Sequence, residues 1–415
     1  FGRSTRRSLA RADELTQKKG GEMSLLLIAN PGSASRKYAL VDDKLKEVAA
    51  LHIEQSGSEL IATLRTGGDT RQVPLGFADI SQSAAHLYGI FNREHLLESP
   101  SDVRAIGLRI VAPSNYFLKD RLVDDDVVQH IRDILPLDPI HVSGTLQELE
   151  ALRSSLPTVP VALISDSAFH ARKPSYAWNY GINLQDADRF EIKRFGYHGL
   201  SVSSAVNELW NRGKLPPKVV VCHLGSGSSV SAVFHGRSID NTMGYSALEG
   251  VIMATRTGSI DYTAAMALKT KLGLDDDQFE HYLDEKGGLL GLSGTSDIRE
   301  ILDREANGDH IAHLALMTLI HSVHKAIGAM VVAMNGADLL VFTGTVGERS
   351  ANLRRRIVAH LECLDFILDG NRNKSCLNPT EFTSISQAAV SKPIIVIPTD
   401  EGVEIARHTI KLLAS

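Results

Sequence analysis

The sequence predicts an α/β protein built from two structurally related domains. Residues 25–41 and residues 219–234 share one pattern, in which an apolar strand, a turn rich in glycine and serine, and a second apolar strand follow one another. The two copies begin roughly 190 residues apart, about one domain length, which indicates duplication of a domain rather than a short repeat. The chain of 415 residues is long enough for two domains with well-packed cores.

The second copy of this pattern is the clearer one. Residues 219–222 form a continuous apolar run, as expected of a strand buried on both faces, and residues 230–234 form the return strand. The turn between them has the sequence GSGSS. Glycine lets the backbone approach an anion, so such a tip suits phosphate, and a plain surface turn is the alternative. Two tips that face each other across a cleft would hold a polyphosphate, an arrangement that resembles the actin-like and sugar-kinase-like ATPases.

The composition is that of an ordinary soluble protein, with 43% apolar and 22% charged residues. A net charge of −5 gives no reason to expect nucleic acid or an anionic membrane as partner. The three cysteines lack metal-ligand spacing and form no disulfide framework, which fits a reducing cytoplasm. Residues 311–334 are the most apolar helical region, but histidines and a lysine interrupt them, so we expect a buried helix and no membrane span.

Residues 1–22 differ from the rest and are left out of the predicted fold. They are rich in arginine and lysine, and Met23 precedes the first strand. The acidic residues Asp13, Glu14 and Glu22 argue against an organellar targeting peptide. We therefore expect a disordered leader or an upstream extension.

The first half of the chain mixes strand and helix patterns, as an α/β domain requires. Arg109 lies in an apolar strand and either faces a ligand or ends the strand in water. Asp166 follows a buried strand, where open α/β sheets place ligand groups, and a helix cap is the alternative. Strands are predicted at residues 48–53, 60–65, 105–111 and 159–164, and helices at residues 81–91 and 144–156.

The second half contains three further candidate segments. His198 lies among glycines and aromatic residues, and its imidazole either projects into a cleft or serves as a structural hydrogen-bonding group. Asp297 lies in a loop, where its simplest role is to cap the next helix. Residues 339–348 lead from a strand into a glycine turn before a helix at 350–361, so they form a phosphate loop or a plain connector. A last strand is predicted at residues 394–398, and a last helix from there to about residue 413.

Taken in order, these segments resemble the acetate kinase family of short-chain acyl kinases. The resemblance runs from Met23 nearly to the end, with similar spacings. Its motifs are N-x-G-S-x-S-x-K at residues 30–37, D-x-x-F-H at 166–170, GYHG at 196–199, CHLG at 222–225, LEG at 248–250 with Thr255-Arg256, and IPT-x-E at 397–401. It implies two actin-like, ribonuclease-H-like domains with a central cleft, and reversible phosphoryl transfer from ATP to a carboxylate.

The resemblance also assigns the chemistry. Arg109 and Arg256 are implied to clamp the carboxylate and the moving phosphoryl group, and guanidinium groups suit both. His198 is implied to donate a hydrogen bond to that phosphoryl group, and Asp166 to orient an arginine or a metal-bound water. No general base is required, because acetate is already an anion at neutral pH.

The nucleotide and the metal ion are placed by the same resemblance. Asn30 and Glu401 are implied to hold Mg²⁺, with Mn²⁺ as an alternative, because Mg²⁺ takes most of its ligands from water and phosphate. The residues implied to bind nucleotide or phosphate are Lys37, His223, Gly225, Ser226, Gly227, Asp297, Ile298, Arg299, Gly344, Thr345, Val346, Gly347 and Arg349.

The acceptor pocket is predicted to combine Arg109 with Val111, Leu137, Tyr197 and Ala247. Ala247 takes the place of a proline in the family, and the smaller side chain leaves room for about one methylene. Propionate or butyrate is therefore an alternative acceptor to acetate.

Three other departures from the family pattern concern the substrates. Thr345 replaces a glycine and Arg349 an asparagine, which either narrows the adenosine pocket or leaves Thr345 outside it with Arg349 stacked on adenine. In the first case a smaller donor such as pyrophosphate would replace ATP. Asp138 replaces a histidine near the acceptor.

A third hypothesis is a non-catalytic, actin-like protein that binds nucleotide. Such a protein would not need two arginines beside His198.

The predicted domain limits follow from these assignments. Residues 23–165 plus 399–415 form the N-terminal domain, and residues 166–398 form the C-terminal domain with the nucleotide loops. The return of the last helix to the first domain is implied by the resemblance, as is a homodimer.

Overall fold

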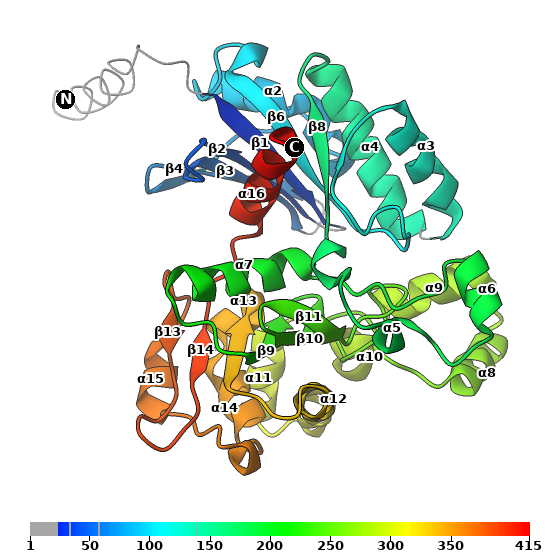
Figure 1. Cartoon of the computed structure of the whole chain (residues 1–415), viewed down its shortest axis with the longest axis vertical. Helices are drawn as coiled ribbons and strands as arrows, with labels where there is room; N and C mark the ends of the chain where they lie inside the picture. The colour runs from blue at the N-terminus through cyan, green and yellow to red at the C-terminus, as the bar shows by residue number, and fades with distance from the viewer. Residues whose placement is uncertain (1–23, 33–34, 57–58, 138) are drawn as a thin grey trace.

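The structure is a computed structural model that describes residues 24–32, 35–56, 59–137 and 139–415. The predicted leader (1–22) and Asp138 therefore lie outside the described residues. Figure 1 shows two α/β parts, one above the other, with the C-terminal helix in the upper part beside the N-terminal strands.

Each part is built around one sheet, which we call the first and the second sheet. The first has the strand order β5-β4-β3-β2-β1-β6-β8-β7 and the second the order β11-β10-β9-β12-β14-β13. The strands of the first sheet are β1 (Leu25–Pro31), β2 (Ser35–Val41), β3 (Glu47–Ser56), β4 (Glu59–Thr66), β5 (Asp69–Gln72), β6 (Val103–Ile110), β7 (Arg121–Leu122) and β8 (Val161–Ser165). Those of the second are β9 (Lys218–Leu224), β10 (Ser228–Phe234), β11 (Arg237–Asn241), β12 (Leu339–Thr343), β13 (Thr383–Ser384) and β14 (Ile394–Val396).

The two sheets repeat one topology. In the first, β3, β2 and β1 pair antiparallel, and β6 and β8 then continue in parallel from β1. In the second, β11, β10 and β9 pair antiparallel, and β12 and β14 continue in parallel from β9. The predicted duplication of an α/β domain is confirmed, because five strands correspond in order and direction.

Alternate residues of the central strands pack against different layers, since successive side chains of a strand point to opposite faces. Leu27 of β1 belongs to the core formed with α2 (Ser83–Arg93) and α4 (Pro139–Ser155). Its neighbour Ile28 packs with Ile405 of α16 (Glu401–Leu413). Both faces of the strand are therefore buried, as the uninterrupted apolar run predicts.

Two helices form the layer between the sheets. Helix α7 (Gly199–Asn211) covers one face of the second sheet, where Val202 and Leu209 pack against β9 and β12, while Leu200 reaches the core below α16. Helix α16 lies on the first sheet and beside α7 (Figure 1). This position agrees with the return of the last helix to the first domain, and the exact domain limits stay a prediction.

The remaining helices lie outside this central layer. Helix α12 (His310–Ala333) is the one helix of the described chain that is long and apolar enough to span a membrane, with half of its most apolar stretch buried. It packs in the core of the second sheet through residues such as Leu316 and Ile320, as a buried helix does. The other helices are α3 (Asp125–Ile134), α5 (Ser175–Trp178), α6 (Leu184–Arg189), α8 (Tyr262–Leu272), α9 (Asp276–Glu285), α10 (Gly288–Ser293), α11 (Ile298–Ala306), α13 (Gly344–Arg349), α14 (Ala351–Val358) and α15 (Gly370–Ser375).

The segment after β12 differs from the prediction. We expected a glycine turn followed by a helix at 350–361, and the structure has the short helix α13 in place of the turn, then α14. Gly344 has φ 79°, and a Cβ there would lie 2.7 Å from the carbonyl oxygen of Leu224. Glycine therefore lets the chain turn sharply against β9 and enter a helix at once.

Candidate active site

Arg109 is held at the end of β6 by residues of the first sheet. Its Nη2 donates to Oδ2 of Asp166 (2.8 Å) and its Nη1 to Oδ1 of Asn30 (3.2 Å). Its Nε is buried and makes no hydrogen bond within the described residues. Burial disfavours the charge, but Asp166 and Glu401 outweigh this and raise the pKa of Arg109. The side chain is therefore a fixed cation whose Nε–H is available to a further partner.

Asp166 orients Arg109 and also caps a helix, whereas its predicted role toward a ligand stays a prediction. The carboxylate is fully buried. Besides binding Arg109, it accepts the backbone N–H groups of His198 (2.8 Å) and Leu200 (3.3 Å) and so caps α7. Burial alone would raise its pKa, but Arg109 and these N–H groups lower it. One ionised carboxylate thus links Arg109 of the first sheet to the backbone of His198.

His198, His223 and Arg256 meet beside the tip of the second hairpin. A Cβ added to Gly227 would lie 3.0 Å from Nε2 of His198 and 3.4 Å from Nη1 of Arg256, so only glycine fits there without displacing them. The rings of His198 and His223 are 4.2 Å apart between centroids. Nδ1 of His198 shares a hydrogen bond with the Ser229 hydroxyl (3.1 Å).

These two histidines are neutral at neutral pH. Burial, reinforced by His223, Arg109 and Arg256, lowers the pKa of His198 well below its usual value. Burial also lowers the pKa of His223, whose Nδ1 bonds the Ser201 hydroxyl at 2.7 Å. A neutral imidazole with Nδ1 bonded to a hydroxyl leaves Nε2 for a second partner, and in both rings Nε2 lies toward the glycine turn.

Arg256 is oriented by Asp284 of α9. Its Nε donates to Oδ1 of Asp284 (2.7 Å), and both side chains are mostly buried. A carboxylate on one edge of the guanidinium fixes its plane and its direction. Each predicted arginine thus has its own carboxylate partner, Asp166 for Arg109 and Asp284 for Arg256.

The predicted metal ligands also lie together. Nδ2 of Asn30 donates to Oε2 of Glu401 at 2.7 Å, which joins the end of β1 to the first turn of α16. No cluster of three or more histidine, cysteine, aspartate or glutamate side chains suitable for a metal occurs in the part of the chain that the structure describes. One carboxylate and one amide oxygen fit Mg²⁺ that keeps mostly water and phosphate ligands, and would not suit a dedicated protein cage.

The predicted phosphate turn, residues 225–227, is the exposed end of the β9–β10 hairpin. The backbone N–H of Gly225 donates to the Ser228 hydroxyl (3.3 Å), and Ser226 is exposed. Thr345 approaches this turn, because its backbone N lies 3.8 Å from where a Cβ on Gly225 would be. Lys37 is exposed on β2, opposite Asn30.

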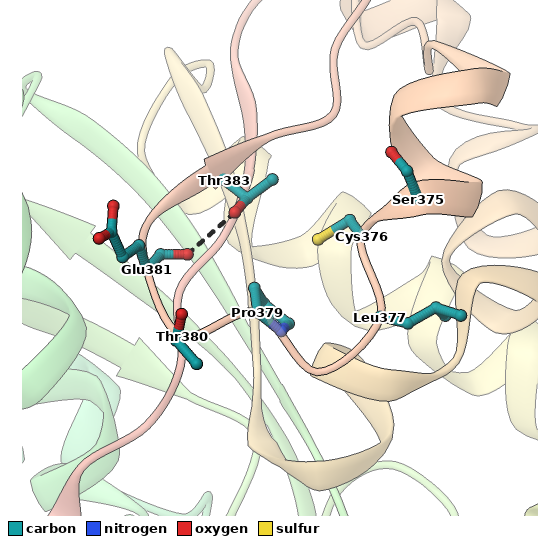
Figure 2. Close-up of a pocket in the computed structure, with 7 residues that line it drawn as sticks. All are labelled: Ser375, Cys376, Leu377, Pro379, Thr380, Glu381 and Thr383. Carbon is teal, nitrogen blue, oxygen red and sulfur yellow. Dashed lines mark hydrogen bonds between the residues drawn. The ribbon is translucent and has the colours of Figure 1, made fainter. Parts of the chain in front are cut away.

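Helix α13 carries the residues predicted to contact adenosine. Gly344 and Gly347 are buried and Val346 is partly buried, whereas Thr345 and Arg349 are exposed. Nε of Arg349 donates to Oδ1 of Asn378 (3.0 Å). The residues on both sides of Asn378 line a cavity of about 320 Å³, shown in Figure 2. Its walls are Ser375, Cys376, Leu377, Pro379, Thr380, Glu381 and Thr383.

The third predicted nucleotide segment pairs mainly with itself. Asp297 caps α11, which begins at Ile298, through the N–H of Arg299 (2.8 Å). The Arg299 guanidinium binds the same carboxylate, and its side chain is 86% exposed. The helix-cap alternative is therefore the geometry observed, and a role in binding nucleotide stays a prediction.

The predicted acceptor pocket is brought together in part. Val111, Tyr197 and Ala247 belong to one apolar cluster, and the Tyr197 hydroxyl donates to the carbonyl of Tyr245 (2.6 Å). Leu137 is not in this cluster and is 48% exposed. The part of the predicted pocket that Val111, Tyr197 and Ala247 form is thus apolar and closely packed.

Sequence reasoning missed the residues that hold the others in place. Asp284 carried no recognisable signal, because an acidic residue within a helix is usually solvated. Ser229 had a usable one, since it follows the glycine turn and pairs with His223 across the hairpin. Ser201, Glu348 and Thr399 stood inside or beside recognised motifs but had no assigned role.

Comparison with known proteins identifies what this arrangement resembles. Residues 25–407 match the family described as the Acetokinase family. An acetate kinase from Clavibacter michiganensis is 36% identical over 401 residues, covering 94% of this chain and 100% of its own. A crystal structure of Porphyromonas gingivalis acetate kinase superposes with a TM-score of 0.83 at 27% identity, covering 94% of this chain and 100% of that one. A propionate kinase from Francisella tularensis superposes with a TM-score of 0.84 at 30% identity, covering 93% and 99%.

Proposed function

Because this chain belongs to the acetokinase family, we propose that it transfers a phosphoryl group reversibly from ATP to acetate, giving acetyl phosphate and ADP. The single observation that carries the proposal is that Arg109 of β6 is joined through Asp166 to His198, and that Arg256 lies beside the His198 ring at Gly227. This set supplies two fixed cations and one neutral donor, which suits a carboxylate acceptor and a phosphoryl group in transit.

In this mechanism an acetate oxygen attacks the terminal phosphorus, a new P–O bond forms, and the bond to the departing ADP oxygen breaks. The acetate is already ionised, so the protein needs to remove no proton. Arg109 holds the carboxylate or an equatorial phosphoryl oxygen with the N–H groups that Asp166 and Asn30 leave free. Arg256, directed by Asp284, neutralises the charge that spreads over the equatorial oxygens. Nε2–H of His198 donates to the same group.

The residues present fit Mg²⁺ as the ion that accompanies ATP. Glu401 would hold it, directly or through water, and Asn30, whose amide oxygen accepts from Arg109 through one lone pair, would use the other lone pair or a bridging water. When bound, the ion neutralises phosphate charge and helps to orient the nucleotide. Arg109, fixed on the other side of Asn30, contributes positive charge to the same region.

Ala247 supports propionate as a second carboxylate acceptor besides acetate. It packs with Val111 and Tyr197 in the apolar cluster, where one methylene is worth about 1–3 kcal/mol. We therefore propose that propionate is used within about tenfold of acetate, an estimate at the low end of that range. The Francisella relative is a propionate kinase, which is compatible with this proposal.

The homodimer and the cytoplasmic location remain proposals based on the family resemblance. All three cysteines are free thiols, which a reducing compartment would preserve. Size-exclusion chromatography with light scattering would test the dimer, since a single species of about 45.1 kDa would contradict it.

The proposed function is tested by trapping acyl phosphate with hydroxylamine over a grid of carboxylates and phosphoryl donors. We expect ATP with acetate to give the highest rate, and no product without a carboxylate. Pyrophosphate as the better donor would correct the nucleotide part of the proposal. No turnover with any pair would support the non-catalytic alternative and refute the proposed function.

A further inference from the structure

Thr399 ties the two ends of α13 to the start of α16. Its backbone N–H donates to Oε1 of Glu348 at 2.9 Å, near the end of α13. Its hydroxyl accepts the backbone N–H of Gly344 at 3.1 Å, at the beginning of that helix. The same hydroxyl also bonds the hydroxyls of Thr343 and Ser201. One residue between β14 and α16 therefore fixes the helix predicted to lie under adenosine.

Glu348 is itself held rigidly through its backbone. Nη1 of Arg354 donates to the carbonyls of Gly347 (2.7 Å) and Glu348 (2.8 Å). Arg354 is fully buried, and its Nε donates to Oδ1 of Asn373 at 2.8 Å. Because the backbone of Glu348 is held in place, its carboxylate has a defined position. The bond to the Thr399 N–H therefore holds Thr399 at a fixed place relative to α13.

The chain that leaves Thr399 leads directly to the proposed metal ligand. Glu401 follows two residues later and accepts from Nδ2 of Asn30, which in turn accepts from Arg109. Two sets of hydrogen bonds, Glu348 to Thr399 and Glu401 through Asn30 to Arg109, are thus joined by the short covalent segment from Thr399 to Glu401.

We propose that Glu348 is a positioning residue, which uses the Thr399 N–H to set Glu401 in register with the nucleotide helix. The proposal rests on the proposed kinase function, because Glu401 and α13 are taken as its metal and nucleotide elements. What matters is a hydrogen-bond acceptor at this position, and its negative charge is not required. A glutamine should therefore replace Glu348, whereas an alanine should not.

The test compares Glu348→Gln and Glu348→Ala with the wild-type chain and with Glu362→Ala, an exposed glutamate in the same part of the fold. Hydrogen–deuterium exchange without substrates reports the tie directly. Peptides containing Thr399 should exchange about tenfold faster in Glu348→Ala and within about threefold of wild type in Glu348→Gln. In turnover, Glu348→Ala should lose about tenfold in kcat, as loss of an outer-shell partner typically does, with the KM for ATP changed by less than threefold.

Four outcomes would overturn this assignment. Equal losses in the glutamine and alanine variants would mean that the charge is used directly. A raised KM for ATP in both would mean a direct contact with nucleotide. A lower Tm in Glu348→Ala with unchanged kcat would mean a structural role alone, and unchanged exchange at Thr399 would remove the tie. An inactive wild-type protein would instead refute the proposed function, and the exchange measurement would still test the tie.

Discussion

Replacing Asp166 by asparagine should damage both stability and turnover, because one fully buried carboxylate serves three donors. The amide oxygen of the variant can still accept the His198 N–H, but Arg109 loses the charge that compensates its burial. Breaking one partner of a buried ion pair costs about 3–5 kcal/mol. At about 2–4 °C of Tm per kcal/mol for a domain of this size, Tm should fall by at least about 6 °C.

The effect on turnover should follow from the same contacts. Arg109 loses its main anchor and the His198 backbone loses a charge-assisted bond, so we expect kcat to fall by about a hundredfold, as for loss of one preorganised electrostatic contact. Thermal unfolding and the hydroxylamine assay measure the two losses. Glu150→Gln is the matched control, because Glu150 pairs with Arg132 on the surface and such pairs are worth about 0–1 kcal/mol.

The pH dependence of stability gives a second, independent test of the role of Asp166. The pKa of Asp166 is lowered by folding, so its contribution to stability is present above the unfolded pKa and is lost as pH falls through the folded one. Wild-type stability should therefore decrease more steeply below about pH 4 than that of Asp166→Asn. If Asp166→Asn kept its Tm within about 2 °C and its kcat within about threefold of wild type, the argument would be refuted. Loss of the buried ion pair should lower both quantities by more than that.

Three further predictions follow from other contacts. Arg256→Ala should lower kcat by about a hundredfold, and Arg256→Lys should not restore it, because an ammonium group cannot bind Asp284 and phosphate at once as a guanidinium can. A wild-type kcat in either variant would exclude Arg256 from the mechanism. His408 should stabilise the fold until the pH rises well above neutral. Burial opposes its charge, but bonds to Asp120 and Glu404 raise its pKa to about 9, so its contribution is complete below about pH 6.5 and is lost as pH rises through about 9. Tm should thus fall more between pH 7 and pH 10 in wild type than in His408→Gln, and parallel curves would contradict this. Thr345→Gly should leave the KM for ATP within about threefold, because the exposed Thr345 side chain points away from the packed core; a KM at least tenfold lower would instead favour an occluded adenosine pocket and a smaller donor.

The fold was predictable because its signal is local and repeated. Apolar runs such as residues 219–222 specify strands buried on both faces, and the same strand–turn–strand pattern occurs near the start. The sequence did not predict that residues 344–349 are helical, because two glycines within six residues usually mark a turn. The contact between Gly344 and the Leu224 carbonyl decides that geometry, and it joins strands far apart in the chain.

The site was predictable where a motif carried the chemistry and unpredictable where a partner came from elsewhere. Asp166 and His198 were singled out, and the structure adds that the carboxylate of one accepts the N–H of the other. Asp284 could not be found, because its importance comes from a contact with Arg256 across 28 positions of sequence. Asp297 and Arg299 were assigned to the nucleotide through resemblance alone, and that assignment stays a prediction, whereas the helix cap that the spacing indicated is the geometry in the structure.

The two buried histidines explain how the site can hold so much charge without a cationic imidazole. Arg109 and Arg256 are each paired with one carboxylate, so both guanidinium groups are already held in place before any substrate binds. A protonated His198 would be a third cation, buried and with its ring 4.2 Å from that of His223. Burial and repulsion by the neighbouring groups disfavour this charge, which is why the pKa of His198 is lowered. In the proposed function His198 would therefore act as a neutral donor, with its ring oriented by the bond between Nδ1 and the Ser229 hydroxyl. A neutral donor of this kind would stabilise a phosphoryl group during the proposed transfer without adding a third positive charge, and the arginines would neutralise the charge on its oxygens.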